Sequence, residues 1–103
     1  PQGVKKQLDI AMAAVENPAV ILLDEPTSGV SVDEKISMMD SVIGPLKGED
    51  ATVLFIEHDM DIVSRFATRT VAFYEGTILA DGPTAEVLQN HKVREYVIGG
   101  THA

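Results

Sequence analysis

The sequence predicts an α/β fold, in which parallel strands are joined by flanking helices. Two unbroken apolar runs support this prediction, at residues 20–23 and 52–56, because a strand buried in a parallel sheet is apolar on both faces. Segments with helical periodicity lie before, between and after these runs. A Glu75-Gly76 pair between two shorter runs predicts a terminal β-hairpin.

The first two elements are predicted to be a helix and a strand. Apolar residues recur at helical spacing from Val4 to Val15, and Asn17-Pro18 should end that helix. The strand then spans residues 19–24, where four aliphatic residues run directly into Asp24 and Glu25.

A second helix and a second strand follow. Apolar residues repeat at helical spacing between Val32 and Ile43, Ser31 precedes them as a cap, and Gly44-Pro45 should end or kink the helix. Residues 52–56 are β-branched, aromatic and unbroken, which indicates the second buried strand.

The last part of the chain is predicted to hold short elements. A helix should bury Ile62, Val63 and Phe66, with acidic residues near its positive N-terminus. The hairpin strands span residues 70–74 and 77–81, and two short helices follow, the first begun by Pro83 and the second covering about residues 91–97.

Composition limits the class of protein. With 103 residues and 45% hydrophobic residues, the chain corresponds to about one small domain. Its net charge of −8 argues against a nucleic-acid surface and against a polybasic membrane anchor. The absence of cysteine excludes a disulfide framework and a thiolate metal site. No apolar run is long enough to span a bilayer.

Both buried strands end in charged residues, Asp24-Glu25 in the first and Glu57-His58 in the second. Carboxyl ends of neighbouring parallel strands meet at the sheet edge where open α/β folds bind ligands. There, Asp24 could hold Mg²⁺ on a nucleotide, and Glu25 could orient or deprotonate an attacking water. His58 could donate a hydrogen bond to a phosphate oxygen or to that water.

Each of these signals alone has a second interpretation. An Asp-Glu pair is equally consistent with a strand that ends in a solvated acidic turn, and a single His at a strand end is more often structural. The apolar run before Asp24, the Pro-Thr-Ser-Gly run after Glu25 and a His one strand away together favour the nucleotide site.

With these motifs in this order, nearly the whole chain resembles the C-terminal part of an ATP-binding cassette (ABC) ATPase domain, which has a P-loop NTPase (RecA-like) fold. Residues 21–26 resemble the Walker B strand, residues 27–31 the D-loop, and residues 56–59 the switch segment. Residues 1–8 stand at the position of the signature motif and the helix that follows it.

The last part of the chain indicates which ABC ATPases it resembles most. The hairpin and helix of residues 75–88 are similar to the closing elements of bacterial importer ATPases. Residues 93–99 are similar to the ending of the ATP-binding subunits of branched-chain amino acid importers. The lipopolysaccharide-export ATPase has a similar tail and is an alternative within the family.

The resemblance implies roles for five residues. Asp24 would support Mg²⁺ through water, Glu25 would be the catalytic base, and His58 would contact the γ-phosphate of ATP. Gly3, in the signature position, and Ser28, in the D-loop position, would contribute to nucleotide binding across a dimer of two ATPase subunits.

The chain departs from the family pattern in the signature motif and in the D-loop. Pro1, Gln2 and Val4 replace the customary serine, glycine and glutamine, and Ser31 replaces an aspartate. Signature contacts to a phosphate would therefore depend on backbone N–H groups and on the positive end of the helix that starts near Gly3.

The implied function is an ATP- and Mg²⁺-dependent ATPase subunit of an ABC transporter that powers import of branched-chain amino acids or a related small polar solute. It would pair with a second ATPase subunit and dock on two transmembrane permease subunits, at the cytoplasmic face of the bacterial cell membrane. It would neither enter the membrane nor bind nucleic acid. A non-transport ABC ATPase and an interaction domain that has lost catalysis are alternatives.

The sequence contains no Gly-x-x-x-x-Gly-Lys-Ser/Thr phosphate loop. We therefore expect residues 1–103 to be the C-terminal portion of one ABC ATPase domain, with no turnover alone. Without the strand and helix of that loop, four apolar residues should lose part of their cover: Leu22, Leu23, Leu54 and Phe55.

Overall fold

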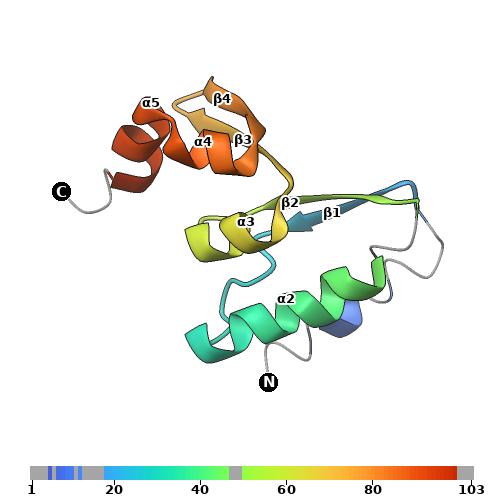
Figure 1. Ribbon diagram of the computed structural model, residues 1–103. Coiled ribbons are helices and arrows are strands. Elements are labelled where there is room, and N and C mark those ends of the chain that lie inside the picture. Colours follow the sequence, from blue (N-terminus) through green and yellow to red (C-terminus); the bar gives the residue numbers. More distant parts are fainter. Residues whose placement is uncertain (1–4, 6, 11, 13–17, 47–49, 100–103) are drawn as a thin grey trace. The chain divides into compact units, whose positions relative to one another are not determined.

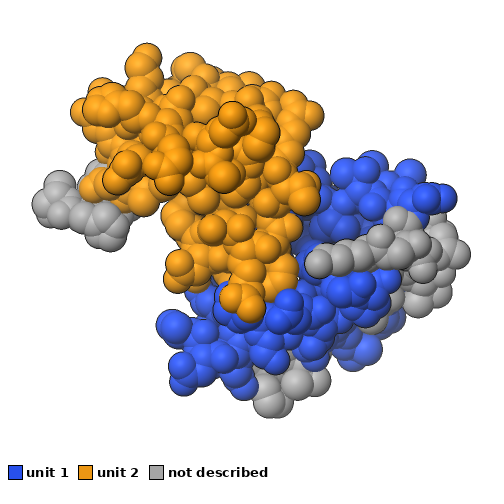
Figure 2. Space-filling model, viewed as in Figure 1, with its two compact units in different colours: residues 1–58 blue, residues 59–103 orange. Residues whose placement is uncertain are grey.

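The computed structural model describes residues 5, 7–10, 12, 18–46 and 50–99. The chain forms two compact units, residues 1–58 and residues 59–103, which Figure 2 colours blue and orange. Figure 1 labels the helices and strands in chain order. The order of elements is the predicted alternation of helix and strand, followed by a hairpin and short helices.

Unit 1 contains the predicted parallel pair of strands. Strand β1 spans Val20–Asp24 and strand β2 spans Thr52–Ile56, and they pair in parallel with Leu22 opposite Leu54. Helix α2 spans Val32–Leu46 between them. Residues 5, 7–10 and 12 are helical, in agreement with the predicted first helix, and its other predicted residues lie outside the described residues.

The sheet of unit 1 is covered on one face only, so the prediction that both faces are buried is wrong for this chain. Ile21 and Leu23 are buried, whereas Leu22 on β1 is 62% exposed and Leu54 on β2 is 57% exposed. Successive strand residues point to opposite faces, so one face packs inward and the other faces solvent. The expected loss of cover is confirmed for Leu22 and Leu54 but is wrong for Leu23, which lies on the packed face with Ile21; Phe55 is half-buried.

Helix α2 begins after Ser31, as predicted. The Ser31 carbonyl accepts the N–H groups of Glu34 and Lys35, and the Ser31 hydroxyl donates to the Glu34 carboxylate at 3.0 Å. Of the two effects expected of Gly44-Pro45, an end or a kink, the first does not occur before Pro45, since the helix includes Pro45 and continues to Leu46. A proline so close to the last residue disturbs only the final turn. The buried side of α2 consists of Met38, Met39, Val42 and Ile43.

Unit 2 is built from short elements around a hairpin. These elements are α3 (Met60–Phe66), β3 (Arg69–Tyr74), β4 (Thr77–Pro83), α4 (Thr84–Gln89), α5 (His91–Val93) and the π-helix η1 (Arg94–Ile98). The single last helix predicted for residues 91–97 is thus a three-residue α-helix followed by a π-helical turn. None of the helices in the described residues is both long and apolar enough to cross a membrane.

The hairpin turn is the two-residue turn that the sequence predicts. Glu75 and Gly76 both have positive φ, 48° and 76°, which is the backbone conformation of a type I′ turn. Ala72 on β3 packs in a small core with Val87 and Val93 from the helices. Partly buried residues complete this core: Leu79, Ala80, Val97 and Ile98.

Candidate functional site

The loops that follow β1 and β2 begin side by side in unit 1. Asp24, the last residue of β1, is paired with Ile56, the last residue of β2. The next residue, Glu25, donates its backbone N–H to the Ile56 carbonyl at 2.8 Å, which extends the strand pairing by one hydrogen bond. The charged residues after each strand therefore start at the same sheet edge, as the sequence predicts.

Glu25 has a backbone conformation that is uncommon for a residue with a side chain. Its φ is +48°, in the left-handed region. The following Pro26 disfavours the right-handed helical conformation for Glu25. A hydrogen bond from the Ser28 N–H to the Glu25 carbonyl, 3.0 Å long, closes a tight turn over residues 25–28. Such backbone strain is concentrated at functional sites in proteins.

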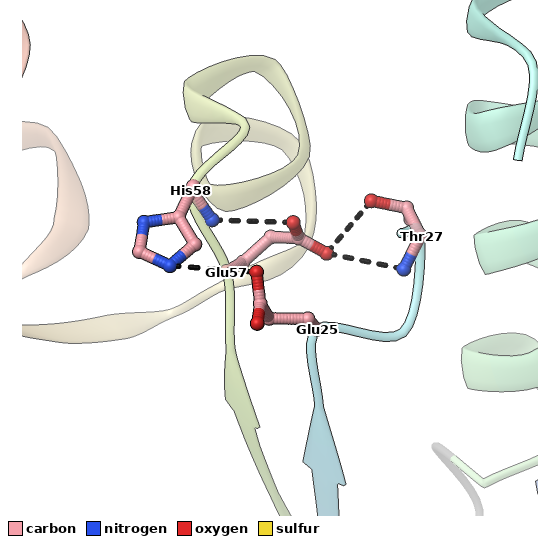
Figure 3. Close-up of polar contacts among 4 residues, drawn as sticks. All are labelled: Glu25, Thr27, Glu57 and His58. Atoms are coloured by element: carbon pink, nitrogen blue, oxygen red, sulfur yellow. Dashed lines mark hydrogen bonds and ion pairs between the residues drawn. The ribbon is translucent and has the colours of Figure 1, made fainter. Parts of the chain in front are cut away.

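Glu25 and His58 are in contact. The His58 Nε2 atom lies 3.4 Å from the Glu25 Oε1 atom, as drawn in Figure 3. The His58 side chain is 80% exposed and that of Glu25 is 49% exposed, so both are open to a ligand. This contact brings together the two residues that the sequence predicts to be catalytic.

A second contact between the two loops involves Glu57 and Thr27. The Thr27 hydroxyl donates to Glu57 Oε2 at 2.8 Å, and the Thr27 N–H donates to the same oxygen at 3.4 Å. The other carboxylate oxygen, Oε1, accepts the His58 N–H at 3.2 Å (Figure 3). Sequence reasoning assigned no role to Glu57 and none to the Thr27 side chain. The only signal in the sequence was position, because Glu57 directly precedes His58 and Thr27 lies two residues after Glu25.

The remaining predicted site residues are only partly placed. Asp24 and Ser28 are exposed, Asp24 at the end of β1 and Ser28 in the turn that follows. Gly3 lies outside the described residues. His91 was not predicted to be a site residue; it pairs with Glu95 on the next helical turn at 3.5 Å, and its side chain is 91% exposed.

The residues present suit Mg²⁺ bound to a nucleotide. A carboxylate oxygen is a hard ligand, and Mg²⁺ in proteins often takes one or two carboxylates together with phosphates and water. Asp24 offers such an exposed carboxylate. The described residues include no cluster of three or more His, Cys, Asp or Glu that could hold a metal ion by themselves. The donor set therefore fits an ion that is shared with a phosphate ligand.

The Glu25 carboxylate and the His58 imidazole could together transfer a proton and polarise a water molecule bound between them. A carboxylate accepts a proton or a hydrogen bond, and an imidazole N–H donates one. Glu25 and His58 place these two groups within 3.4 Å of each other on an exposed edge. An arrangement of this kind suits hydrolysis of a ligand that carries an oxyanion.

Comparison with known proteins agrees with this assignment. No family model matches the chain. A protein of Staphylococcus aureus (strain COL) named as an ABC transporter ATP-binding protein is 37% identical over 93 residues, which are 90% of this chain and 16% of the relative. A protein of Brucella ovis named as a peptide import ATP-binding protein is 33% identical over 98 residues, which are 94% of this chain and 28% of the relative. Neither name mentions branched-chain amino acids.

A solved structure is similar as well. The crystal structure of UvrA2 from Deinococcus radiodurans superposes with a TM-score of 0.66 and 27% identity, over 82% of this chain and 11% of the UvrA2 chain. The chain thus spans less than a third of the length of these relatives. The chain is similar in sequence to part of these ATP-binding proteins, and its α/β fold corresponds to part of the P-loop NTPase fold.

Proposed function

We propose that residues 1–103 are the C-terminal portion of an ABC ATPase domain that hydrolyses ATP to power transport. The main observation in support is the 3.4 Å contact between Glu25 Oε1 and His58 Nε2 at the ends of adjacent parallel strands. The names of the Staphylococcus aureus and Brucella ovis relatives support the same activity.

In the proposed reaction a water molecule attacks the γ-phosphate of ATP in line with the leaving group. Glu25 orients this water and accepts its proton, and its left-handed backbone fixes where the carboxylate starts. His58 donates a hydrogen bond from its imidazole to a γ-phosphate oxygen. Because the two side chains touch, the water and the phosphate oxygen are held at neighbouring points.

The nucleotide would be held by residues on both sides of an ATPase dimer. Asp24 would hold Mg²⁺ through water, and the bound ion would neutralise charge on the phosphates. Gly3 and Ser28 would contribute to the half-site offered to the ATP of the second subunit. The phosphate loop would come from the rest of the complete domain, because this sequence contains none.

The proposed setting is the cytoplasmic face of the bacterial cell membrane. There the complete domain would pair with a second ATPase subunit and dock on two transmembrane permease subunits. The solute would enter the cell. The tail of residues 93–99 supports branched-chain amino acids as the solute, and the name of the Brucella ovis relative supports peptides.

The test is hydrolysis and uptake by the complete protein. We expect the purified ATPase to release phosphate from Mg-ATP and, when reconstituted with its permease in liposomes, to drive uptake of branched-chain amino acids. Uptake of peptides instead would correct the solute and keep the transport function. An ATPase that hydrolyses ATP but associates with no membrane subunit and drives no uptake would favour a non-transport ABC ATPase, and outward movement of lipid would favour the lipopolysaccharide-export type. No hydrolysis under any condition would refute the proposal.

A further inference from the structure

We propose that Glu57 is a positioning residue, whose carboxylate ties the loop after β1 to the loop after β2 and so fixes the distance between Glu25 and His58. This inference rests on the proposed ATPase function. Glu57 itself would touch neither ATP nor the attacking water.

The two oxygens of the Glu57 carboxylate serve different loops. Oε2 accepts the Thr27 hydroxyl at 2.8 Å and the Thr27 N–H at 3.4 Å, in the loop after β1. Oε1 accepts the His58 N–H at 3.2 Å, in the loop after β2 (Figure 3). One side chain thus links a residue two positions after Glu25 to the backbone of the neighbouring His58.

This link is costly to break because the Thr27 side is closed to water. Thr27 is 0% exposed, so its hydroxyl cannot exchange Glu57 for a solvent partner. Within the described residues, no buried side-chain nitrogen or oxygen lacks a hydrogen-bond partner. A bond to a charged carboxylate is also stronger than one between neutral groups. Loss of the carboxylate would force the Thr27 loop to move or leave a buried donor unpaired.

The Glu25–His58 pair depends on such a link because its own side chains are exposed. The His58 ring, 80% exposed, has little packing of its own to hold it near Glu25. The Glu25 N–H bond to Ile56 fixes the loops at the strand ends, and the Glu57–Thr27 bond fixes them again farther out. Two attachments define the relative position of the loops better than one, and catalytic groups need that precision.

The activity test uses three variants of the complete ATPase domain. Thr27→Val removes the hydroxyl at almost constant volume, Thr27→Ser keeps the hydroxyl, and Glu57→Gln removes one of the two acceptor oxygens. We expect Thr27→Val and Glu57→Gln to lower kcat about 10–100-fold with KM for ATP changed less than about threefold. Thr27→Ser should restore kcat to within about threefold of wild type. The double variant Thr27→Val with Glu57→Gln should have the same kcat as Glu57→Gln alone, since the two changes break the same link.

A structural test does not require ATP hydrolysis. In the complete ATPase domain, the imidazole resonances of His58 should shift when Glu25→Gln is introduced, because the side chains touch. In the Thr27→Val or Glu57→Gln background this response should shrink or vanish. Urea unfolding of each variant separates this local effect from loss of the fold.

Three outcomes would overturn the proposal. The first is a wild-type kcat in Thr27→Val. The second is a kcat that is as low in Thr27→Ser as in Thr27→Val. The third is a shift of the His58 resonances on Glu25→Gln that is unchanged in the Glu57→Gln background. If the wild-type complete domain hydrolyses no ATP, the proposed function fails. The resonance test would then still decide whether Glu57 positions His58.

Discussion

The His58 imidazole Nε2 lies 3.4 Å from the Glu25 carboxylate Oε1. Glu25 directly follows β1, and His58 lies two residues after the end of β2, the parallel partner of β1. The register of that pair places Asp24 opposite Ile56, so the two loops leave the sheet together. A basic and an acidic group from distant parts of the chain thus meet at an exposed sheet edge. This meeting is the basis of the first two predictions.

Glu25→Gln in the complete domain should abolish turnover but preserve nucleotide binding. The amide keeps the shape of the side chain and cannot accept a proton from water, so kcat should fall about 10²–10⁴-fold. Dimers bound to ATP should accumulate on a sizing column because the nucleotide is no longer hydrolysed. Glu86→Gln, at an exposed position of α4, is the matched control and should keep wild-type kcat. Near-normal hydrolysis by Glu25→Gln would remove Glu25 as the base.

His58→Ala should slow hydrolysis by a similar factor, about 10²-fold or more, with nucleotide affinity largely unchanged. The substitution removes the proposed donor to the γ-phosphate but none of the phosphate-loop contacts. His91→Ala serves as the control, because His91 is also exposed and also contacts a glutamate, Glu95 at 3.5 Å. Equal rates for the two variants would mean that His58 has no special role.

The local sequence was enough to predict the strands, the hairpin turn and the Glu25–His58 pair. Apolar runs and turn residues are local signals, and a parallel sheet then brings strand ends together. The Glu57–Thr27 bond could not be predicted, because it depends on the exact path of two loops over 30 residues of sequence separation. The left-handed backbone of Glu25 was not predicted either, because this conformation is usually marked by a glycine and the position holds a glutamate.

The covering of the sheet was predicted only in part, correctly for Leu22 and Leu54 but not for Leu23, because an apolar run does not show which of its residues share a covered face. Leu22 and Leu23 are the same residue type on the same strand, yet one is 62% exposed and the other 6%. Alternation along the strand determines which face each occupies. Only tertiary structure determines which face is covered.

The 103-residue chain should bind Mg-ATP weakly or not at all. The phosphate loop supplies most of the contacts to a triphosphate, and the sequence contains none. Isothermal titration should detect no binding in the micromolar range, with the complete domain as the positive control. A micromolar dissociation constant for the chain would reveal a nucleotide site other than the proposed one around Asp24, Glu25 and His58.

The pKa of Asp81 should depend on Arg69. Two hydrogen bonds from the Arg69 guanidinium, 2.9 and 2.8 Å long, stabilise the charged carboxylate and lower its pKa below the ordinary value of 3.8. Desolvation raises the pKa of Asp81 by less than the hydrogen bonds lower it, and the Coulombic attraction to Arg69, the smallest of the three effects, adds to the lowering. Arg69→Gln should therefore raise the pKa of Asp81 back toward 3.8, as measured by carboxyl-carbon NMR titration.

The sign of the effect on stability follows from this shift. A carboxyl group whose pKa is depressed in the folded state stabilises the fold above its unfolded pKa and loses that contribution as the pH falls through the folded value. The contribution of the Arg69–Asp81 pair to the hairpin should thus be complete above about pH 4 and decline as the pH falls below that value, and it should be small throughout, because both groups are exposed. Arg65→Gln, on α3, should leave the Asp81 titration unchanged. An unchanged titration in Arg69→Gln would contradict the pairing.

The exposed sheet face should make the isolated chain marginally stable or self-associating. Leu22 lies opposite Leu54 across the strand pair, and both side chains are more than half exposed. Covering a side chain of this kind is worth about 1.5–3 kcal/mol, against roughly 5–15 kcal/mol for a whole domain. Within the described residues β1 and β2 pair only with each other, and an open strand edge invites pairing with another copy.

The combined variant Leu22→Thr and Leu54→Thr should therefore reduce the apparent mass in light scattering at a given concentration. Threonine has the β-branched shape that a strand favours, and it removes most of the apolar area of leucine. Val32→Thr is the matched control, because Val32 is 82% exposed at the start of α2 and is not part of the sheet, and its change should leave the mass unaltered. A wild-type chain that is a monodisperse monomer with a steep, high-midpoint urea transition would show that the bare leucines neither weaken the fold nor attract a second copy, and that this segment folds autonomously.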